Sequence, residues 1–336
     1  MDQERRSALL ETKLGALVRD AFGATGGAPL SFPGGAARLT DGVFDVLVEE
    51  PARSIGPALA LALHHGASRV RILATDGAGR LAAQAAAFSV PVEVRWVRGT
   101  EVHAVDPAEL AAPAPPPDAP ELAALLAEAG LDVVVEHGRI AGELRGLELA
   151  RVHVPSDSSP VALEVGVGQA DRELTAMLHG ELAPDAALAR VVGTVGAVRR
   201  PDAEPHPLNR LAPERWLRWV VRTDPALAGA AGVIEPVPSP QPRHGLRDRD
   251  VACARATLDD GSAAVVVCSV GVDLDLVPVA AEARALYGPD LDLVLVIPAR
   301  DVHRTTAALA GALARPARIV AIDDGWRSLE RDIPAR

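Results

Sequence analysis

The sequence is poor in aromatic residues and in lysine, and both shortages restrict what the protein can be. Phe, Trp and Tyr make up 3% of the 336 residues, so Val, Leu and Ala must fill the hydrophobic core. The 34 basic residues include one lysine, Lys13, and no Gly-Lys-Ser or Gly-Lys-Thr sequence occurs. A phosphate-binding P-loop needs that lysine and is therefore excluded. Because Lys13 lies in a predicted surface helix, catalysis through a lysine Schiff base is excluded as well.

Cysteine pairs and the common catalytic motifs are also missing. Cys253 and Cys268 lie far apart in apolar runs, and no Cys-x-x-Cys pair exists. This spacing excludes a zinc site built from thiolates and argues against a disulfide framework, so we expect two buried structural thiols. No His-Glu-x-x-His and no Gly-x-Ser-x-Gly sequence occurs. No motif therefore identifies a metal or a cofactor, and the turn that would carry the nucleophilic serine of a hydrolase triad is missing.

Long apolar runs are absent too. No run approaches the ~18 apolar residues of a membrane span, and the N-terminus is charged where a signal peptide would be apolar. We therefore expect a cytoplasmic protein that does not insert into membranes. The formal net charge of −11 opposes non-specific binding of nucleic acid or membranes, although a local basic patch could still bind either.

The order of predicted elements indicates an α/β fold with an internal duplication. Strand, strand, helix, strand, helix and strand follow one another on both sides of a different central region, with hairpin turns at Asp41-Gly42 and Asp260-Gly261. Apolar strands that alternate with helices favour mostly parallel sheets covered on both faces. The alternative is that the similarity reflects only what all α/β chains share.

Proline-rich stretches divide the chain into predicted domains. These are an N-terminal helix with the first α/β repeat (1–106), a Pro/Ala linker (107–120), a central β-meander and helical region (121–234), a proline-rich linker (235–250) and the second α/β repeat (251–336). In the central region we expect a helix at 121–129, hairpin turns at His137-Gly138 and Arg145-Gly146, and a strand at 161–168. Helices at 170–179 and 184–199 and one starting near Pro213 follow.

The junction between the strand at 161–168 and the next helix is a candidate anion site. Gly166 and Gly168 would let the backbone approach a ligand, the helix start offers free amides, and Arg172 adds a positive charge. No Gly-x-Gly-x-x-Gly fingerprint is present, because Asp171 occupies the third glycine position and would repel a phosphate. The alternative is that Asp171 favours the helix start and the glycines only turn the chain.

Carboxylates near this junction are candidate catalytic groups. Glu164, Asp171, Glu173 and His179 could form a carboxylate–imidazole cluster that binds a divalent ion or acts as acid and base. The alternative is a partly buried Glu164 paired with an arginine. The helix and three strands of 121–154, which carry Glu148, resemble the core of the PD-(D/E)xK nucleases, but the lysine expected two residues after Glu148 is alanine. That departure puts nuclease activity in doubt.

An arginine-bearing helix is the third candidate site. Arg215 and Arg218 recur at helical spacing beside Trp216 and Trp219, and guanidinium groups with aromatic faces suit phosphates and stacked bases. The candidate set also includes His206, Asn209 and Arg210, which lie in the segment that precedes this helix. The alternative is that the tryptophans are buried and the arginines are solvated or paired with Asp and Glu.

The strand LEVGVG with Asp-Arg-Glu after it, followed by HPLNRLAPERWLR, resembles uncharacterised proteins of actinobacterial genomes, and this resemblance implies a source but no activity. Three functions stay open. We expect first a binding or regulatory module for an anionic ligand, such as a phosphorylated small molecule or nucleic acid at a local basic patch. The alternatives are a metal-dependent hydrolase or divergent nuclease, and an interaction protein that forms a homodimer through its sheet edges.

Overall fold

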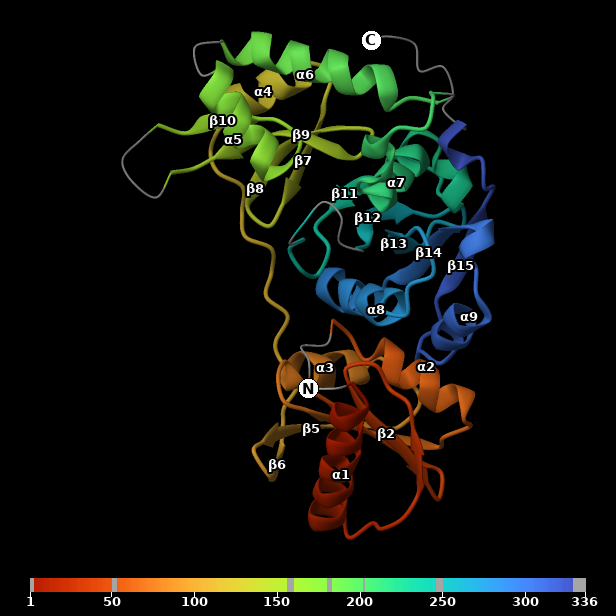
Figure 1. The fold of residues 1–336 in the computed structure, drawn as a ribbon. Helices are drawn as coiled ribbons and strands as arrows, with labels where there is room; N and C mark the ends of the chain where they lie inside the picture. Colours follow the sequence, from red (N-terminus) through yellow and green to blue (C-terminus); the bar gives the residue numbers. More distant parts are fainter. Residues whose placement is uncertain are drawn as a thin grey trace. The chain divides into compact units, whose positions relative to one another are not determined.

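The computed structural model describes residues 3–49, 53–155, 160–179, 183–201, 203–243, 245 and 250–328. Within them, helices alternate with strands that form three sheets, so the predicted α/β fold class is confirmed (Figure 1). The chain divides into two compact units. Unit 1 comprises Met1–Leu110, Leu274–Ala285 and His303–Arg318, and unit 2 comprises Ala111–Asp273, Leu286–Val302 and Ile319–Arg336.

Unit 1 contains a sheet whose strands follow the chain in order. The strands are β1 (Ala28–Leu30), β2 (Gly35–Thr40), β3 (Val43–Val48), β4 (Arg69–Ala74), β5 (Val92–Arg98) and β6 (Glu101–Ala104). β3, β4 and β5 are parallel to one another, and the outer pairs are antiparallel. The connecting helices are α2 (Gly56–His64) and α3 (Ala78–Ala85). The amphipathic helix α1 (Gln3–Phe22) buries Leu10, Leu14 and Leu17 against Leu47 and Leu73 of one face, as their helical spacing allows, whereas Leu9 is exposed.

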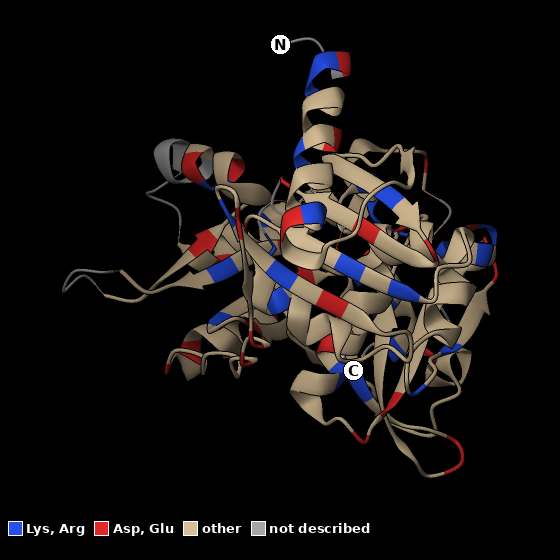
Figure 2. Ribbon diagram, turned by 90° about the horizontal axis from the view of Figure 1, so that it is seen from below, with Lys and Arg blue, Asp and Glu red and all other residues tan. Residues whose placement is uncertain are grey.

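Charged side chains cross this sheet in register. Arg38, Asp45, Arg71 and Glu93 occupy opposite positions on β2, β3, β4 and β5. Asp45 has no exposed side-chain surface and pairs with Arg71 at 2.8 Å and with Arg38 at 3.4 Å. Burial raises the pKa of Asp45, although the two guanidinium groups oppose the shift. Acidic and basic segments accordingly lie beside one another on neighbouring strands (Figure 2).

Unit 2 contains an antiparallel sheet in the order β10 (Ala162–Val165), β9 (Leu147–His153), β8 (Arg139–Leu144) and β7 (Asp132–Glu136). The predicted hairpin turns are confirmed, since His137 and Gly138 have φ of 48° and 74°, and Arg145 and Gly146 have φ of 47° and 75°. Two positive φ angles define the tight hairpin turn that favours glycine at its second position. Helices α4 (Pro120–Glu128), α5 (Gly168–His179) and α6 (Pro184–Val198) accompany this sheet.

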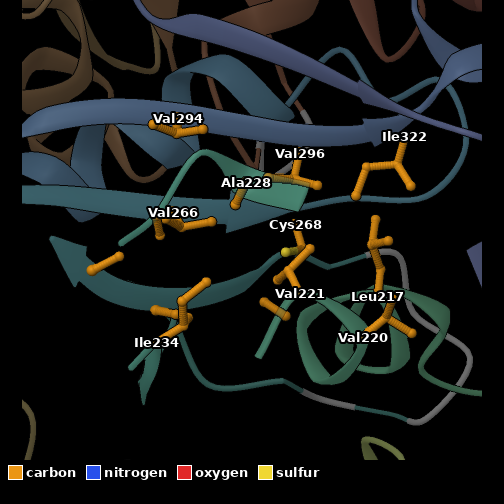
Figure 3. Close-up of a cluster of buried hydrophobic side chains, with 14 of the residues drawn as sticks. Leu217, Val220, Val221, Ala228, Ile234, Val266, Cys268, Val294, Val296 and Ile322 are labelled. Carbon is orange, nitrogen blue, oxygen red and sulfur yellow. The ribbon is translucent and has the colours of Figure 1, made fainter. Parts of the chain in front are cut away.

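Unit 2 also contains the five-stranded sheet of β11 (Glu235–Val237), β12 (Ala252–Thr257), β13 (Ala263–Cys268), β14 (Asp292–Pro298) and β15 (Arg318–Ile322). Helix α7 (Pro213–Thr223) packs on β12 and β13. Leu217, Val220 and Val221 of this helix meet Val266 and Cys268 in a mostly aliphatic core (Figure 3). Trp216 and Trp326 belong to the same core. Both cysteines are buried and free, as expected for structural thiols.

The two segments that the sequence predicts to be repeats have the same order of strands. β1 to β5 and β11 to β15 are each arranged consecutively, and in both sets the second and third strands are antiparallel and the third and fourth are parallel. Helices α2 and α3 of the first repeat correspond in order to α8 (Leu276–Tyr287) and α9 (Arg304–Gly311) of the second. Most of α8 and all of α9 belong to unit 1.

Some boundaries differ from those that the sequence predicts. The strand predicted at 161–168 ends at Val165, because Gly166 has a φ of 141° that breaks the extended run. The stretch predicted as a proline-rich linker contains β11, and β6 lies where no strand was predicted. Short 3-10 helices occur at Pro207–Arg210, Pro225–Ala228, Ala299–Asp301 and Trp326–Ser328. In the described part of the chain, no helix is long and apolar enough to cross a membrane.

Candidate functional site

The arginines predicted to form a cationic stripe on α7 are held by two glutamates. Arg215 donates to Glu143 at 2.7 Å and also to Glu136, and Arg218 donates to the same two carboxylates at 3.1 and 3.0 Å. The side chains of Arg218 and Glu143 are 1% and 3% exposed. Because Glu136 ends β7 and Glu143 lies on β8, these ion pairs fix α7 to the antiparallel sheet.

Electrostatics favour the charged forms of Glu143, Arg215 and Arg218 in this cluster. Burial alone would raise the pKa of Glu143, but the guanidinium groups of Arg215 and Arg218 lower it overall. Burial likewise opposes the charge of Arg215, and Glu136 and Glu143 raise its pKa instead. A phosphate would have to displace these carboxylates to reach either arginine. The geometry therefore favours the alternative considered above, in which the helix arginines pair with acidic residues.

The strand–helix junction binds its own carboxylate. Asp171 accepts a hydrogen bond from the backbone N–H of Val167 at 2.6 Å, so it occupies the position that an anion would take at the start of α5. A Cβ added to Gly166 would lie 2.8 Å from the backbone nitrogen of Arg172. Glycine is thus required at this position because the backbone of Arg172 in α5 lies too close to leave room for a side chain. This arrangement leaves little for a ligand to bind at Gly166 and Gly168.

The candidate catalytic carboxylates are neutralised by arginines. Arg172 donates to Glu148 at 3.0 Å and lies 3.6 Å from Glu164, and Arg151 donates to Glu164 at 2.8 Å. The ring Nδ1 of His153 lies 3.5 Å from Glu164. Burial raises the pKa of Glu148, although Arg172 opposes the shift. A divalent ion would have to compete with two guanidinium groups for these oxygens.

No group of three or more His, Cys, Asp or Glu side chains that could hold a metal ion occurs among the described residues. Glu173 of the predicted cluster receives a hydrogen bond from Gln169 at 2.8 Å on the surface of α5. The side chain of His179 lies outside the described part of the chain. The structure therefore brings Glu148 and Glu164 together through Arg172, but it does not add Asp171 or Glu173 to them.

The residues before α7 shape the chain locally. His206 accepts a hydrogen bond from the N–H of Leu208 at 3.3 Å and so caps the 3-10 helix Pro207–Arg210. Asn209 donates to the carbonyl of Val198 at 2.9 Å, which ties this turn to the end of α6. Arg210 is exposed. Two of these three predicted binding residues thus have structural hydrogen bonds.

Sequence reasoning missed Arg199, which organises this region. Its side chain is fully buried and donates to the carbonyl oxygens of Leu208 at 2.9 Å, Leu211 at 3.1 Å and Arg145 at 2.9 Å. Arg145 donates in return to the carbonyl of Arg199 at 2.8 Å. Burial lowers the pKa of Arg199 to about 9, so the group is charged at neutral pH. The only signal in the sequence is its place at the end of a predicted helix, where cations are favoured.

Arginines also cover the tryptophans of unit 2. The guanidinium carbon lies 5.4 Å from the ring centre for Arg145 over Trp219, 4.5 Å for Arg199 over Trp216, and 4.3 Å for Arg327 over Trp326. Arg327 also lies 5.5 Å from the ring of Trp216. The sequence predicted arginine–aromatic neighbours here, but the arginines that meet the rings are not those of α7.

A groove of about 490 Å³ lies in unit 1, and none of the candidate site residues predicted from the sequence lines it. It is lined by Val92–Arg95 of β5, by Ala104, Val105 and Pro107, and by Ala82 and Ala85 of α3 with Phe88 after it. Its charged groups, Glu93 and Arg95, pair with each other at 2.5 Å. The volume of the groove is within the range of ligand sites, its lining is more apolar than polar, and it lies beside the part of β5 that β6 leaves unpaired.

Comparison with models of protein families, with curated proteins and with solved structures gave no match. The arrangement of the side chains and strand edges is therefore what supports a function.

Proposed function

We propose that this protein is an interaction module that binds an extended peptide segment in the groove beside β5. The observation that carries the proposal is the difference in length between β5 and its outer neighbour. β6 pairs with β5 from Arg95 to Arg98 and ends at Ala104. Val92–Val94 therefore pair with β4 on one side and border the groove on the other, where no described strand pairs with them. An extended segment would continue the pairing where β6 leaves it.

The hydrogen-bonding pattern of β5 supports this placement. The carbonyl of Pro91 accepts from the N–H of Val70 at 2.9 Å, so Pro91 and Glu93 direct their backbone groups toward β4. Alternate residues of a strand direct their N–H and C=O groups to opposite sides. Val92 and Val94 therefore direct theirs toward the groove, at the positions that precede Trp96, which pairs with His103 of β6.

The other functional classes have less support. The carboxylates that a hydrolase would use, Glu148 and Glu164, are paired with arginines, and the arginines of α7 are paired with glutamates. The groove, in contrast, has an apolar lining and outward-directed backbone groups. These are the two elements of β-strand addition, in which main-chain hydrogen bonds give affinity and side-chain pockets give specificity.

The test is selection of short peptides on the full-length chain from a random library, followed by hydrogen exchange of the complex with the best peptide. We expect the peptide to slow exchange at the amides of Val92 and Val94. Val92→Pro removes one donor that points into the groove, so the dissociation constant should rise about fivefold to tenfold. Val92→Thr keeps the donor and a similar shape, and it should bind as the unchanged protein does. A peptide that protects other amides, or equal affinity in Val92→Pro, would refute the assignment.

We propose anion binding as a second candidate function, favoured by Arg327, whose Nε atom has no hydrogen-bond partner among the described residues. Arg199 is fully buried and donates to carbonyl oxygens, so it would add positive charge nearby without contacting the anion. Arg327, half-buried over Trp326, would meet the anion. Pyrophosphate should then raise the melting temperature, and Arg327→Ala should remove most of the shift while the exposed Arg69→Ala keeps it. An undiminished shift in Arg327→Ala rules this out.

A further inference from the structure

The segments that follow α3 and α9 are counterparts in the two repeats. Phe88 stands three residues before Pro91 and leads into β5, and Leu313 stands three residues before Pro316 and leads into β15. By this alignment, Ala87 corresponds to Ala312, and Ser89 corresponds to Ala314 (each pair flanks Phe88 or Leu313 on the same side). Both segments belong to unit 1.

These counterparts pair with each other. Phe88 and Leu313 form an antiparallel bridge, and both side chains are buried. The N–H of Ser89 donates to the carbonyl of Ala312 at 2.9 Å, and the N–H of Ala314 donates to the carbonyl of Ala87 at 2.9 Å. Exchanging every residue for its counterpart turns each of these bonds into the other. Reciprocity of this kind is what a two-fold axis produces in a homodimer.

The starts of the corresponding helices α2 and α8 meet in the same way. Ser54, just before α2, donates to the carboxylate of Asp275, just before α8, at 2.6 Å. A Cβ on Gly56 would lie 1.9 Å from the carbonyl oxygen of Leu274, so the backbones touch at this point. Here again, the segments that meet are corresponding ones, since all four residues lie within two positions of the first residue of α2 or α8.

The remaining contacts join a helix of one repeat to the non-equivalent helix of the other, and they occur twice, as a two-fold relation requires. α2 packs against α9, and its counterpart α8 meets α3, the counterpart of α9. Glu282 of α8 accepts from Arg80 at 2.9 and 3.0 Å and from Gln84 of α3 at 2.8 Å. Gln84 and Glu282 are 1% and 5% exposed, so this polar contact is part of a closed surface.

From these contacts we infer that the helical face of each repeat is a self-complementary association surface, and that its partner is the same face of the other repeat in this chain. The linkage between the repeats is then not needed to hold them together. The surface is of the isologous type, so a change at one residue and the same change at its counterpart should weaken it alike.

The test is to cut the full-length chain at a protease site inserted between Ala111 and Pro117, and to follow the two fragments by size-exclusion chromatography with light scattering. We expect them to elute together with the mass of the uncut chain. Fragments that separate immediately after the cut, while each stays folded by circular dichroism, would overturn the inference.

Variants of the cut protein test the reciprocity. Phe88→Asp and Leu313→Asp should each raise the dissociation constant of the fragments at least tenfold, and the exposed Arg69→Glu should leave it unchanged. If Phe88→Asp separates the fragments and Leu313→Asp does not, the self-complementary arrangement is wrong.

A charge exchange covers the case in which the aspartate variants do not fold. Glu282→Arg alone should weaken association, because Arg80 would then face a like charge. Adding Arg80→Glu should restore it at least in part. Absence of any recovery in the double variant counts against the crossed α3–α8 contact and against the inference.

Discussion

Arg218 donates to Glu143 at 3.1 Å, with the two side chains 1% and 3% exposed, and this pair joins α7 to the centre of an antiparallel sheet. Both charges have been removed from water, at a cost that their attraction offsets only while the geometry is good. Arg215 and Glu136 complete the geometry by giving each charge a second partner. The four side chains depend on one another, because removing any one of them leaves a buried charge with one partner fewer.

Replacing Arg218 with Met should therefore destabilise the protein strongly. Glu143 and Glu136 would keep their charges but lose one of two guanidinium partners, and breaking such a buried pair costs about 3 kcal/mol. The double variant Arg218→Met with Glu143→Gln should be more stable than the single variant, since the uncompensated charge is gone. Urea unfolding measures both free energies, and a single variant as stable as the original protein would contradict this account.

Glu148 should make stability depend on pH. Burial raises the pKa of its carboxyl above the ordinary 4.5, with Arg172 opposing the shift. Such a group binds its proton more tightly in the folded protein than in the unfolded chain. Its contribution to stability is therefore fully present below the unfolded pKa and is lost as the pH rises through the folded pKa.

Glu148→Gln removes this titration. The free energy of unfolding of the original protein, minus that of Glu148→Gln, should decrease as the pH rises above the ordinary pKa of 4.5. Urea unfolding of both proteins at several pH values gives the difference directly. A difference that stays constant or increases with pH would show that the pKa is not raised.

The element order of the fold could be predicted because it depends on local patterns. Asp41-Gly42, His137-Gly138 and Arg145-Gly146 each place glycine where a hairpin turn needs a positive φ, and all three turns form. The apolar periodicity likewise predicted the strands β3, β4 and β5 of unit 1 and β12, β13, β14 and β15 on the C-terminal side. β6 escaped prediction because its four residues are half-buried or exposed and carry no apolar run.

The candidate site could not be predicted at the same level, because partners come from distant parts of the chain. Arg215 and Arg218 recur at helical spacing whether they face solvent or a buried carboxylate, and Glu143 lies 75 residues away from Arg218. The groove exists because β6 pairs with only part of β5. The sequence does not show where this pairing ends. Arg199 is recognised only by the carbonyl groups that surround it.

Gly146 should not tolerate a side chain. It has a φ of 75°, and a Cβ would lie 2.3 Å from the backbone carbon of Arg215 at the start of α7. Gly146→Ala therefore combines backbone strain with a clash against a helix, and we expect a loss of about 4 kcal/mol. Gly130 has a φ of 78° with no atom within 4 Å, so Gly130→Ala should cost about 1 kcal/mol. Equal losses in the two variants, measured by urea unfolding, would mean that the close approach to α7 carries no cost.

Asp45 should be essential to the sheet of unit 1. Its carboxylate has no exposed surface and balances Arg71 at 2.8 Å and Arg38 at 3.4 Å, whose side chains are themselves 9% and 10% exposed. Asp45→Asn keeps the shape but leaves two guanidinium groups buried without a countercharge, so we expect a loss of about 3 kcal/mol.

Asp20 pairs with Arg19 on the surface, where the side chains are 64% and 59% exposed, and Asp20→Asn should change stability by less than about 0.5 kcal/mol. The contrast separates the effect of burial from that of removing a charge, since both variants exchange the same two functional groups. Thermal and urea unfolding of the two proteins should agree, and a stable Asp45→Asn would mean that water or another acidic group, such as Glu93 on the neighbouring strand, compensates the arginines.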